Sequence, residues 1–489
     1  MNAAANRRQK VLDVGHWHPP VSCCRQFSQS IFAARITTLV SRIVHPTHET
    51  VPQQMVQPWH DITSATDRRM ALAREWDRLV DEVRELPDLA DFLRPPDLET
   101  LLPPPTEGPV VVVNVSQWRC DAFIVRHTGV TPLPLPDLTA QSAADWTNSY
   151  LSTLRDAERA AADLDALREH RHGDGGMRGR QAVQRAERTM STALKETEVM
   201  LTDLLAWLWD VAAGPVLDEL GLRETPPPEA QWPRIWWCPT GPMTLLPLHA
   251  AGHHTSGDRP ARTVIDRVVS SYTPTLRALR EARRPLDPTP VAHRMLTVGV
   301  SDAEGQSPLG GVTGELAILA ELLPADRLTE LTGSAATRDA IREQLEGHRW
   351  AHFSCHGIQD LRDPSRGGLV LSDGTLTVTD IAAGQYHADF VGLSACKTAT
   401  GGVNLLDEAI SLSAALHYTG YRHVIGTLWS VYDSDHTTRL FRALYEEIIS
   451  DGRLYPHRSA HALHRATREL RDATADQPSV WTPFTHTGP

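Results

Sequence analysis

Two short segments of the sequence carry residue types that support nucleophilic catalysis by a thiol. His356 and Gly357 end the segment His-Phe-Ser-Cys-His-Gly, and Cys396 lies in the segment Gly-Leu-Ser-Ala-Cys-Lys-Thr. A cysteine attacks as its thiolate, and an imidazole near neutral pH can take up a proton and return it. The two segments therefore predict a cysteine nucleophile, Cys396, and a histidine base, His356.

Each of these segments follows an apolar run that is typical of a buried strand. The runs cover residues 350–353 and residues 390–393. Such short runs, bounded by polar and glycine residues, indicate strands that are buried on both faces. The carboxyl ends of parallel strands form the edge at which open α/β sheets gather their reactive groups. We therefore expect His356 and Cys396 to meet at one edge of a parallel sheet.

Length and composition are those of a globular protein with a large core. The chain has 489 residues, of which 41% are hydrophobic and 22% are charged, and this length allows two or three domains. We find no apolar stretch near the roughly 18 residues of a spanning helix, and the N-terminus lacks the apolar block of a secretion signal. We therefore expect a cytoplasmic protein that makes no membrane contact.

Cysteine usage and charge exclude several classes of partner. The six cysteines, at positions 23, 24, 120, 238, 355 and 396, form no disulfide pattern and no Cys-x-x-Cys pair, so we interpret them as reduced thiols. A formal net charge of −12 argues against a protein that binds nucleic acid through its phosphates. We expect no nucleic acid, no metal and no cofactor.

The first half of the chain is predicted to be mainly helical. Residues 1–60 show no sustained period and are predicted to be a poorly ordered leader. Residues 61–225 carry helical patterns, interrupted by a valine-rich hairpin over residues 109–126 that is expected at a sheet edge. A glycine-rich loop at residues 171–180 separates two long helices and is interpreted as a linker, with a lid as the alternative.

The second half is predicted to be an α/β domain, over residues 226–489. Its short apolar runs alternate with amphipathic helical patterns, which is typical of crossover units in a mainly parallel sheet with helices on both faces. The strand candidates are residues 235–238, 268–272, 295–300, 350–353, 369–371, 390–393 and 424–428. The helical patterns are residues 315–323, 337–345, 405–418 and 435–449.

The helix that follows Cys396 has the clearest predicted ends. Asn404 is its expected N-cap, and Gly420 stands where a left-handed cap would end it. If the loop over residues 397–403 folds back, the positive helix end and the ammonium group of Lys397 would both favour the thiolate of Cys396. This geometry is an expectation about the loop.

The order of these segments resembles that of the CHAT domain family, whose members are caspase- and separase-like peptidases of bacteria. The order is strand, His-Gly, strand, Ala-Cys, helix, and then Gly-Tyr-Arg-His-Val-Ile-Gly-Thr-Leu-Trp-Ser-Val-Tyr-Asp at residues 420–433. The segments at residues 237–250 and 272–279 are similar to an early strand and a helix entry of the family. The resemblance covers roughly residues 230–475.

The resemblance implies a caspase-like fold and peptide-bond cleavage through an acyl-enzyme. Cys396 would be the nucleophile and His356 the acid and base, and the backbone N–H groups of Gly357 and Cys396 would form the oxyanion hole. The 40 residues from His356 to Cys396 are close to the ~50 quoted for caspases, but the local signature differs from that of a caspase.

Two acids after Trp429 are candidates for a substrate pocket. The resemblance implies that Asp433 and Asp435 lie near the pocket for the residue before the cut, where they would favour arginine or lysine. The alternative is that they begin a helix, and the two interpretations have equal weight.

The resemblance also implies a specific protein substrate and a regulatory partner. Relatives often restrain the peptidase through helical repeats, but no 34-residue repeat is found here. We therefore expect the region before residue 226, or a separate regulatory protein, to gate the site. Bacterial defence or cell-death signalling is the expected setting.

Several neighbouring residues are weighed as rivals of the dyad and are interpreted as structural. Cys355 points to the opposite face from His356 in a strand and is expected in the core. His352 lies deeper in the same strand and is expected to be a hydrogen-bonded core histidine. The spacing of four further histidines matches no ligand pattern: His387, His417, His423 and His436.

Three other functions stay open at this point. The fold would also suit a catalytically inactive scaffold, although such a protein needs neither residue of the dyad. The segment at residues 392–396 imitates the Gly-x-Ser-x-Gly turn of serine hydrolases, but Cys396 replaces the final glycine. A redox sensor would need a resolving cysteine, and none stands at an evident distance.

Overall fold

A computed structural model describes residues 58–86, 90, 92–170, 177–227, 229–254, 261–285, 292–303, 306, 308–360, 363–394, 411–429 and 435–489. It divides the chain into two compact units, Met1–Thr100 and Leu101–Pro489. The leader predicted over residues 1–60 lies almost entirely outside the described residues, as do residues 171–176 of the predicted linker.

The first unit contains one long helix, α3 (Pro58–Arg84). Its buried side chains recur at steps of three and four residues, at Leu72, Trp76, Leu79 and Val83, which is the spacing of one helix face. The helical pattern expected in this part of the chain is therefore present. A short helix, α4 (Leu98–Leu101), lies at the boundary between the units.

The second unit is built on one sheet of eleven strands, in the order β3-β2-β1-β4-β5-β16-β13-β12-β8-β6-β7. The strands are β1 (Val110–Asn114), β2 (Asp121–Arg126), β3 (Gly129–Pro134), β4 (Arg234–Pro239), β5 (Val269–Tyr272), β6 (Ala292–Gly299), β7 (Leu328–Thr332), β8 (His348–Ser354), β12 (Ala388–Ser394), β13 (Tyr421–Thr427) and β16 (Phe484–Thr487). Two smaller sheets join β9 (Gly357–Ile358), β10 (Gly368–Leu371) and β11 (Gly374–Thr377), and β14 (Ile449–Ser450) with β15 (Arg453–Leu454).

Seven strand pairs in the second unit are parallel, which confirms a mainly parallel sheet; the antiparallel pairs are β1 with β2, β2 with β3, and β13 with β16. The pairs from β1 through β4, β5 and β16, and from β13 through β12, β8, β6 and β7, are parallel. The predicted hairpin over residues 109–126 is present as β1 and β2, and β1 also pairs with β4. The hairpin therefore belongs to the same sheet as the second half, and the boundary predicted at residue 225 lies within the unit Leu101–Pro489.

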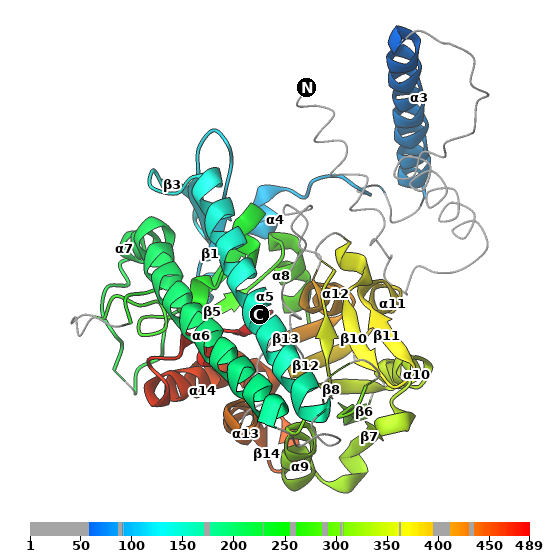
Figure 1. Ribbon diagram of the computed structural model, residues 1–489. Coiled ribbons are helices and arrows are strands. Elements are labelled where there is room, and N and C mark those ends of the chain that lie inside the picture. Colours follow the sequence, from blue (N-terminus) through cyan, green and yellow to red (C-terminus); the bar gives the residue numbers. More distant parts are fainter. Residues whose placement is uncertain are drawn as a thin grey trace. The chain divides into compact units, whose positions relative to one another are not determined.

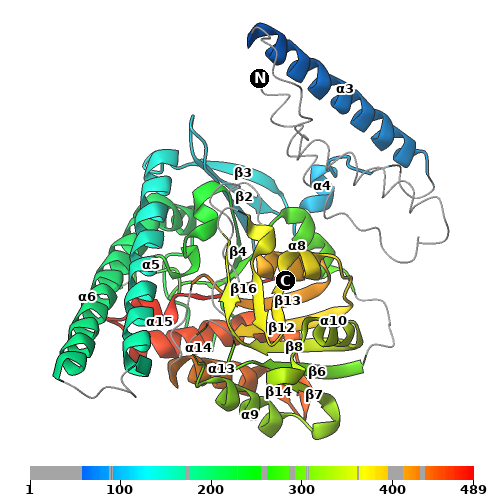
Figure 2. The ribbon, with the colours of Figure 1, turned by 45° about the vertical axis from the view of Figure 1, so that its right-hand side comes forward.

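Helices cover both faces of this sheet, as the sequence predicts (Figures 1 and 2). One face packs against α5 (Ala140–His170), α6 (Met177–Leu208), α7 (Gly214–Glu219), α9 (Val312–Leu322), α13 (Asp435–Ile448) and α14 (Ser459–Ala473). The other packs against α8 (Leu276–Arg283), α10 (Arg338–Gly347), α11 (Val378–Ala382) and α12 (Leu412–Tyr418). A short helix, α15 (Pro478–Trp481), precedes β16.

The expectation that no stretch resembles a spanning helix was wrong for one helix. By length and composition alone, the stretch Gly179–Glu219 is long enough and apolar enough to cross a membrane, but 56% of its most apolar window is buried within the protein. Leu201, Leu204 and Leu208 are fully buried in the core that α6 forms with β1 and β4. Packing against the sheet therefore accounts for this apolar face.

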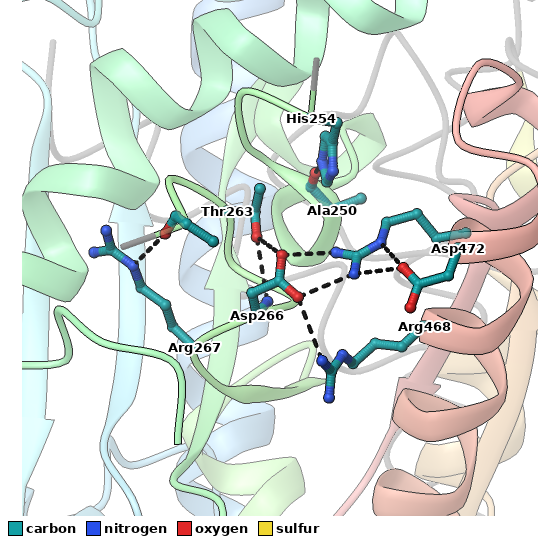
Figure 3. A network of polar contacts seen from close by, with 9 residues as sticks. Ala250, His254, Thr263, Asp266, Arg267, Arg468 and Asp472 are labelled. Carbon is teal, nitrogen blue, oxygen red and sulfur yellow. Dashed lines mark hydrogen bonds and ion pairs between the residues drawn. The ribbon is translucent and has the colours of Figure 1, made fainter. Parts of the chain in front are cut away.

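A network of charged groups fixes the loop before β5 to α14 (Figure 3). Both carboxylate oxygens of Asp266 accept hydrogen bonds from Arg471, at 2.8 and 3.0 Å, and Thr263 donates a third at 2.6 Å. Arg468 lies 3.6 Å from the same carboxylate. Although burial acts in the opposite direction, the Arg471 guanidinium and these hydrogen bonds hold the pKa of Asp266 below its usual value.

Buried histidines are a further feature of this unit. His423 and His486 share a hydrogen bond of 3.1 Å between their rings, and His486 also contacts the Ser271 hydroxyl at 2.9 Å. Burial lowers the pKa of both well below the usual value. Burial also lowers the pKa of three others to about 4, His249, His254 and His417, and that of His464 to about 3.

These histidines predict a loss of stability in acid. Because the folded pKa values lie below the unfolded value of ~6.5, the unfolded state binds more protons as the pH falls. The free energy of unfolding should have its full value above about pH 6.5 and should decrease from there towards pH 4. Each histidine should contribute up to about 1.4 kcal/mol per pH unit to this decrease. Urea unfolding between pH 7.5 and pH 5 measures this slope.

The variant His417→Gln should reduce that slope, because it removes one buried imidazole. His127→Gln is the matched control, because His127 is exposed and exchanging it should leave the slope as it is. A free energy of unfolding that stays constant from pH 7.5 to pH 5 would contradict the prediction.

Candidate active site

The two strands that precede the predicted dyad are direct neighbours in the sheet. β8 and β12 pair in parallel from Trp350 with Phe390 to Ser354 with Ser394. Both strands therefore end at the same edge of the sheet. His356 follows two positions after Ser354, and Cys396 would follow two positions after Ser394. Cys396 and Lys397 lie outside the described residues, so their geometry stays a prediction.

The backbone fixes the start of the loop that carries His356. The carbonyl of His356 accepts a hydrogen bond of 2.8 Å from the N–H of Val370, and Gly357 opens strand β9, which pairs with β10. The preceding residue, Cys355, is 1% exposed within the core on the α10 to α12 side of the sheet. The prediction that Cys355 is a core residue is confirmed, whereas His356 and Gly357 are partly exposed.

His356 and Gly357 line a large groove. Its volume is about 1550 Å³, and it is bordered by α5 and α6 on one side and by β9, the start of α13 and α15 on the other. Two apolar side chains in it are unusually exposed, Val199 at 63% and Ile358 at 39%. A groove of this size, lined by both apolar and charged side chains, is suited to a polypeptide segment.

Of the two acids predicted for a substrate pocket, only Asp435 lies within the described residues. Asp435 is the first residue of α13 and is exposed, a position at which a carboxylate stabilises the helix N-terminus. Asp433 lies outside the described residues. The role of both acids in a pocket therefore stays a prediction.

The helical hairpin of α5 and α6 contacts Trp429 and Ser479. Trp429, which follows β13, is 2% exposed, and its ring meets that of Tyr150 edge-on at a centroid distance of 5.5 Å. The Trp429 indole N–H donates to the Ser479 carbonyl at 3.3 Å. Ser479 in turn donates its N–H and its hydroxyl to the two carboxylate oxygens of Glu198, at 3.0 and 2.5 Å.

Glu198 is a functional candidate that the sequence did not reveal. Burial raises the pKa of its carboxyl, and the two hydrogen bonds from Ser479 oppose that shift. The carboxylate connects α6 to the segment that holds Trp429. Because 281 positions separate Glu198 from Ser479, no local pattern could have paired them.

A second buried carboxylate lies between the two central strands. Glu315, in the first turn of α9, is 3% exposed, and it accepts a hydrogen bond of 2.8 Å from the Ser394 hydroxyl. Its other oxygen lies 3.4 Å from Nε2 of His352, and Nδ1 of His352 contacts the Tyr445 hydroxyl at 2.8 Å. His352 is thus a core histidine, as predicted. The Ser394 hydroxyl thus donates to a buried carboxylate.

The helix after the nucleophile segment is described from Leu412 to Tyr418. It begins at Leu412, and the Ser411 hydroxyl caps it by accepting from the N–H of Ala414 at 3.1 Å. The predicted N-cap, Asn404, lies outside the described residues. The predicted end is confirmed: Gly420 has φ of 122°, and a Cβ there would lie 1.7 Å from the Tyr386 carbonyl oxygen.

The histidines considered as metal ligands do not gather into a site. Within the described ranges, no group of three His, Cys, Asp or Glu side chains could hold a metal ion. His417 and His423 are buried in the core, and His436 lines the groove beside His356.

Comparisons with known proteins agree with this organisation. The sequence profile of the family described as "CHAT domain" matches residues 202–489. No curated protein matches the sequence.

Two solved structures are similar at low identity. A chain of the Saccharomyces cerevisiae separase–securin complex has a TM-score of 0.47 and 10% identity over 80% of this chain, which spans only 30% of that chain. A chain of the Porphyromonas gingivalis RgpB complex of pro- and mature domains has a TM-score of 0.40 and 10% identity, over 57% of this chain and 69% of that one.

The packing of His352 against β12 predicts a strict requirement at Gly392. A Cβ at Gly392 would lie 2.6 Å from the Tyr445 hydroxyl and 3.2 Å from Nδ1 of His352. Gly392→Ala should therefore lower the free energy of unfolding by about 1–3 kcal/mol, the cost of overpacking a core. Urea unfolding measures the change.

Gly314→Ala provides the matched control for this substitution. A Cβ at Gly314 would make an ordinary contact of 3.5 Å with Thr438, and alanine favours a helix by about 1 kcal/mol over glycine. This variant should be as stable as the wild type or more so. Equal stability of the Gly392→Ala protein and the wild type would refute the packing argument.

Proposed function

Because the chain belongs to the CHAT domain family, we propose that it is a cysteine endopeptidase in which Cys396 and His356 form the catalytic dyad. One observation carries this proposal. β8 and β12 are adjacent parallel strands that end side by side at Ser354 and Ser394, and each leads within two residues to a member of the dyad. Parallel strands of an α/β sheet present their catalytic groups at this edge.

The reaction would proceed through an acyl-enzyme. The Cys396 thiolate attacks the carbonyl carbon of the scissile bond, and the backbone N–H groups of Gly357 and Cys396 stabilise the oxyanion. His356 gives its proton to the leaving amine and then takes one from the water that hydrolyses the thioester. These steps need no cofactor.

The proposed substrate is one specific protein, bound in the groove that His356 lines. The exposed side chains of Val199 and Ile358 offer apolar contacts to an extended or helical segment, and the peptide bond would enter beside Gly357. Asp433 and Asp435 would favour arginine or lysine before the cut. The 1550 Å³ groove has room for residues on both sides of the bond.

A peptidase of this kind needs control, because uncontrolled cleavage in the cytoplasm would be toxic. We propose that the protein acts in the cytoplasm and that it serves bacterial defence or cell-death signalling. The unit Met1–Thr100 or a regulatory protein would gate the site. Within the unit Leu101–Pro489, the hydrogen bonds that Ser479 donates to Glu198 and that Trp429 donates to Ser479 join the helical hairpin of α5 and α6 to the segment after β13.

The dyad is tested by co-expressing the protein with the products of neighbouring genes and looking for a discrete cleavage product. Cys396→Ala and His356→Ala should each lower cleavage by at least about 1000-fold, because loss of a nucleophile or its base removes most of the rate enhancement. Ser394→Ala is the matched control, and it should still cleave. Cleavage by the Cys396→Ala protein would refute the mechanism, and no cleavage by the wild type would favour the inactive scaffold.

Gating is tested by deleting residues 1–100, the first compact unit. If this unit restrains the peptidase, the remaining unit should cleave the same substrate about 10-fold faster or without its partner, within the range of typical allosteric couplings. Circular dichroism serves as the control for folding. Unchanged activity together with unchanged partner dependence would refute gating by this unit.

A further inference from the structure

The groove that His356 lines is elongated along the helical hairpin. Its wall on α6 extends from Glu187 to Val199 and uses one face of the helix, because the lining residues recur at steps of three and four. At the helical rise of about 1.5 Å per residue, this stretch is about 18 Å long. An extended peptide advances about 3.3 Å per residue, so the groove has the length for a segment of about five residues.

The walls of this groove carry more carboxylates than cations. Arg168 and Lys195 are the cations among its described lining residues, and Arg168 donates to Glu187 at 3.1 Å. After this pair, one cation faces four further carboxylates. The five carboxylates that line the groove are Glu158 and Asp165 of α5, Glu187 and Glu198 of α6, and Asp476 in the turn between α14 and α15.

Glu198 and Asp476 bring negative charge from the two opposite walls. Burial raises the pKa of the Glu198 carboxyl, the hydrogen bonds from Ser479 oppose that shift, and the charge of Asp476 adds to it. The two carboxylates are therefore close enough to repel each other. Within the part of the chain that the structure describes, no lysine or arginine forms an ion pair with either of them, so a cation from a bound segment would supply the opposite charge.

Exposed apolar side chains lie beside these charges. Val199 directly follows Glu198 in α6 and is 63% exposed, and Ile358, two positions after His356, is 39% exposed. Successive side chains of an extended segment point to opposite sides. A segment that alternates cationic and apolar residues can therefore satisfy the carboxylates and cover the apolar side chains at the same time.

We propose that this groove recognises an extended segment of the substrate in which arginine or lysine alternates with apolar residues, apart from the residue before the cut. The inference rests on the proposed function, because the occupant is the protein substrate. The cations would bind Glu198 and Asp476, and the apolar side chains would pack on Val199 and Ile358. Arginine suits these sites best, since its guanidinium can donate two parallel hydrogen bonds to one carboxylate.

Fluorescence anisotropy tests the proposal on the Cys396→Ala protein, so that cleavage does not enter the measurement. The probes are two labelled peptides of about eight residues, one that alternates arginine with leucine and one that alternates glutamate with leucine. The arginine peptide should bind at least about 10-fold more tightly, and added salt should weaken its binding. Equal binding of the two peptides would overturn the inference.

Variants locate the binding in the groove. Asp476→Lys should weaken binding of the arginine peptide by about 10-fold or more, because it places a like charge on one wall. Glu198→Gln should weaken it by about 3-fold to 10-fold. Circular dichroism confirms that each variant is folded, and Asp476→Asn, with an expected loss of about 2-fold to 5-fold, replaces Glu198→Gln if that protein does not fold.

Two matched controls make the same changes of charge outside the groove. Glu469→Lys in α14 and Glu196→Gln in α6 alter exposed residues that do not line it, and both should bind the arginine peptide within about twofold of the unaltered groove. If the controls weaken binding as much as Asp476→Lys and Glu198→Gln do, the peptide is attracted by the net charge of the protein and the inference is wrong.

The co-expression assay separates this inference from the proposed dyad. With Cys396 intact, Asp476→Lys should lower cleavage of the substrate by about 10-fold, whereas Glu469→Lys should leave it as it is. Unchanged cleavage by the Asp476→Lys protein would contradict a role of the groove in substrate recognition. If the wild type cleaves no protein, the proposed function fails, and the peptide measurements still decide whether the groove selects cationic segments.

Discussion

The parallel pairing of β8 with β12 is the constraint on which the rest of this structure depends. Two strands that run in the same direction deliver their following loops to one edge, and here β8 and β12 pair as far as Ser354 and Ser394 at that edge. The pairing places Trp350, Phe353 and Phe390 in the centre of the core. A shift of register by one residue would turn these side chains to the wrong faces.

A parallel sheet that is buried on both faces needs helices on both faces, and here these helices do more than cover it. α9 and α13 contribute Glu315 and Tyr445 to the cluster between β8 and β12. α6 contributes Glu198, whose carboxylate holds Ser479 and, through it, Trp429. The helical half of the chain is thus joined to the strand ends by hydrogen bonds as well as by apolar packing.

The sequence predicted the central strands because continuous apolar runs between polar segments identify them locally. It missed strands without that signal. β3 carries Pro132 and Pro134, which a sheet tolerates at its edge, and β7 and β16 alternate threonine with apolar residues or histidine. It also missed Glu315, since 79 positions separate it from Ser394. Helical periodicity placed Glu315 only at the start of a helical pattern, and the packing of α9 reveals its burial.

The two carboxylates that bridge β8 and β12 show why stability alone does not explain such groups. Taking a charge out of water costs several kcal/mol, and a hydrophobic pair of similar volume is often as stable. An apolar contact, however, has no preferred direction, whereas a carboxylate that accepts from a defined hydroxyl or guanidinium fixes both position and angle. Glu315 at one end of the strand pair and Asp389, which accepts from Arg349 of β8 at 2.9 Å, at the other therefore act against sliding and splaying of the strands. Of the two ends, that of Glu315 lies at the edge of the sheet where β8 leads to His356.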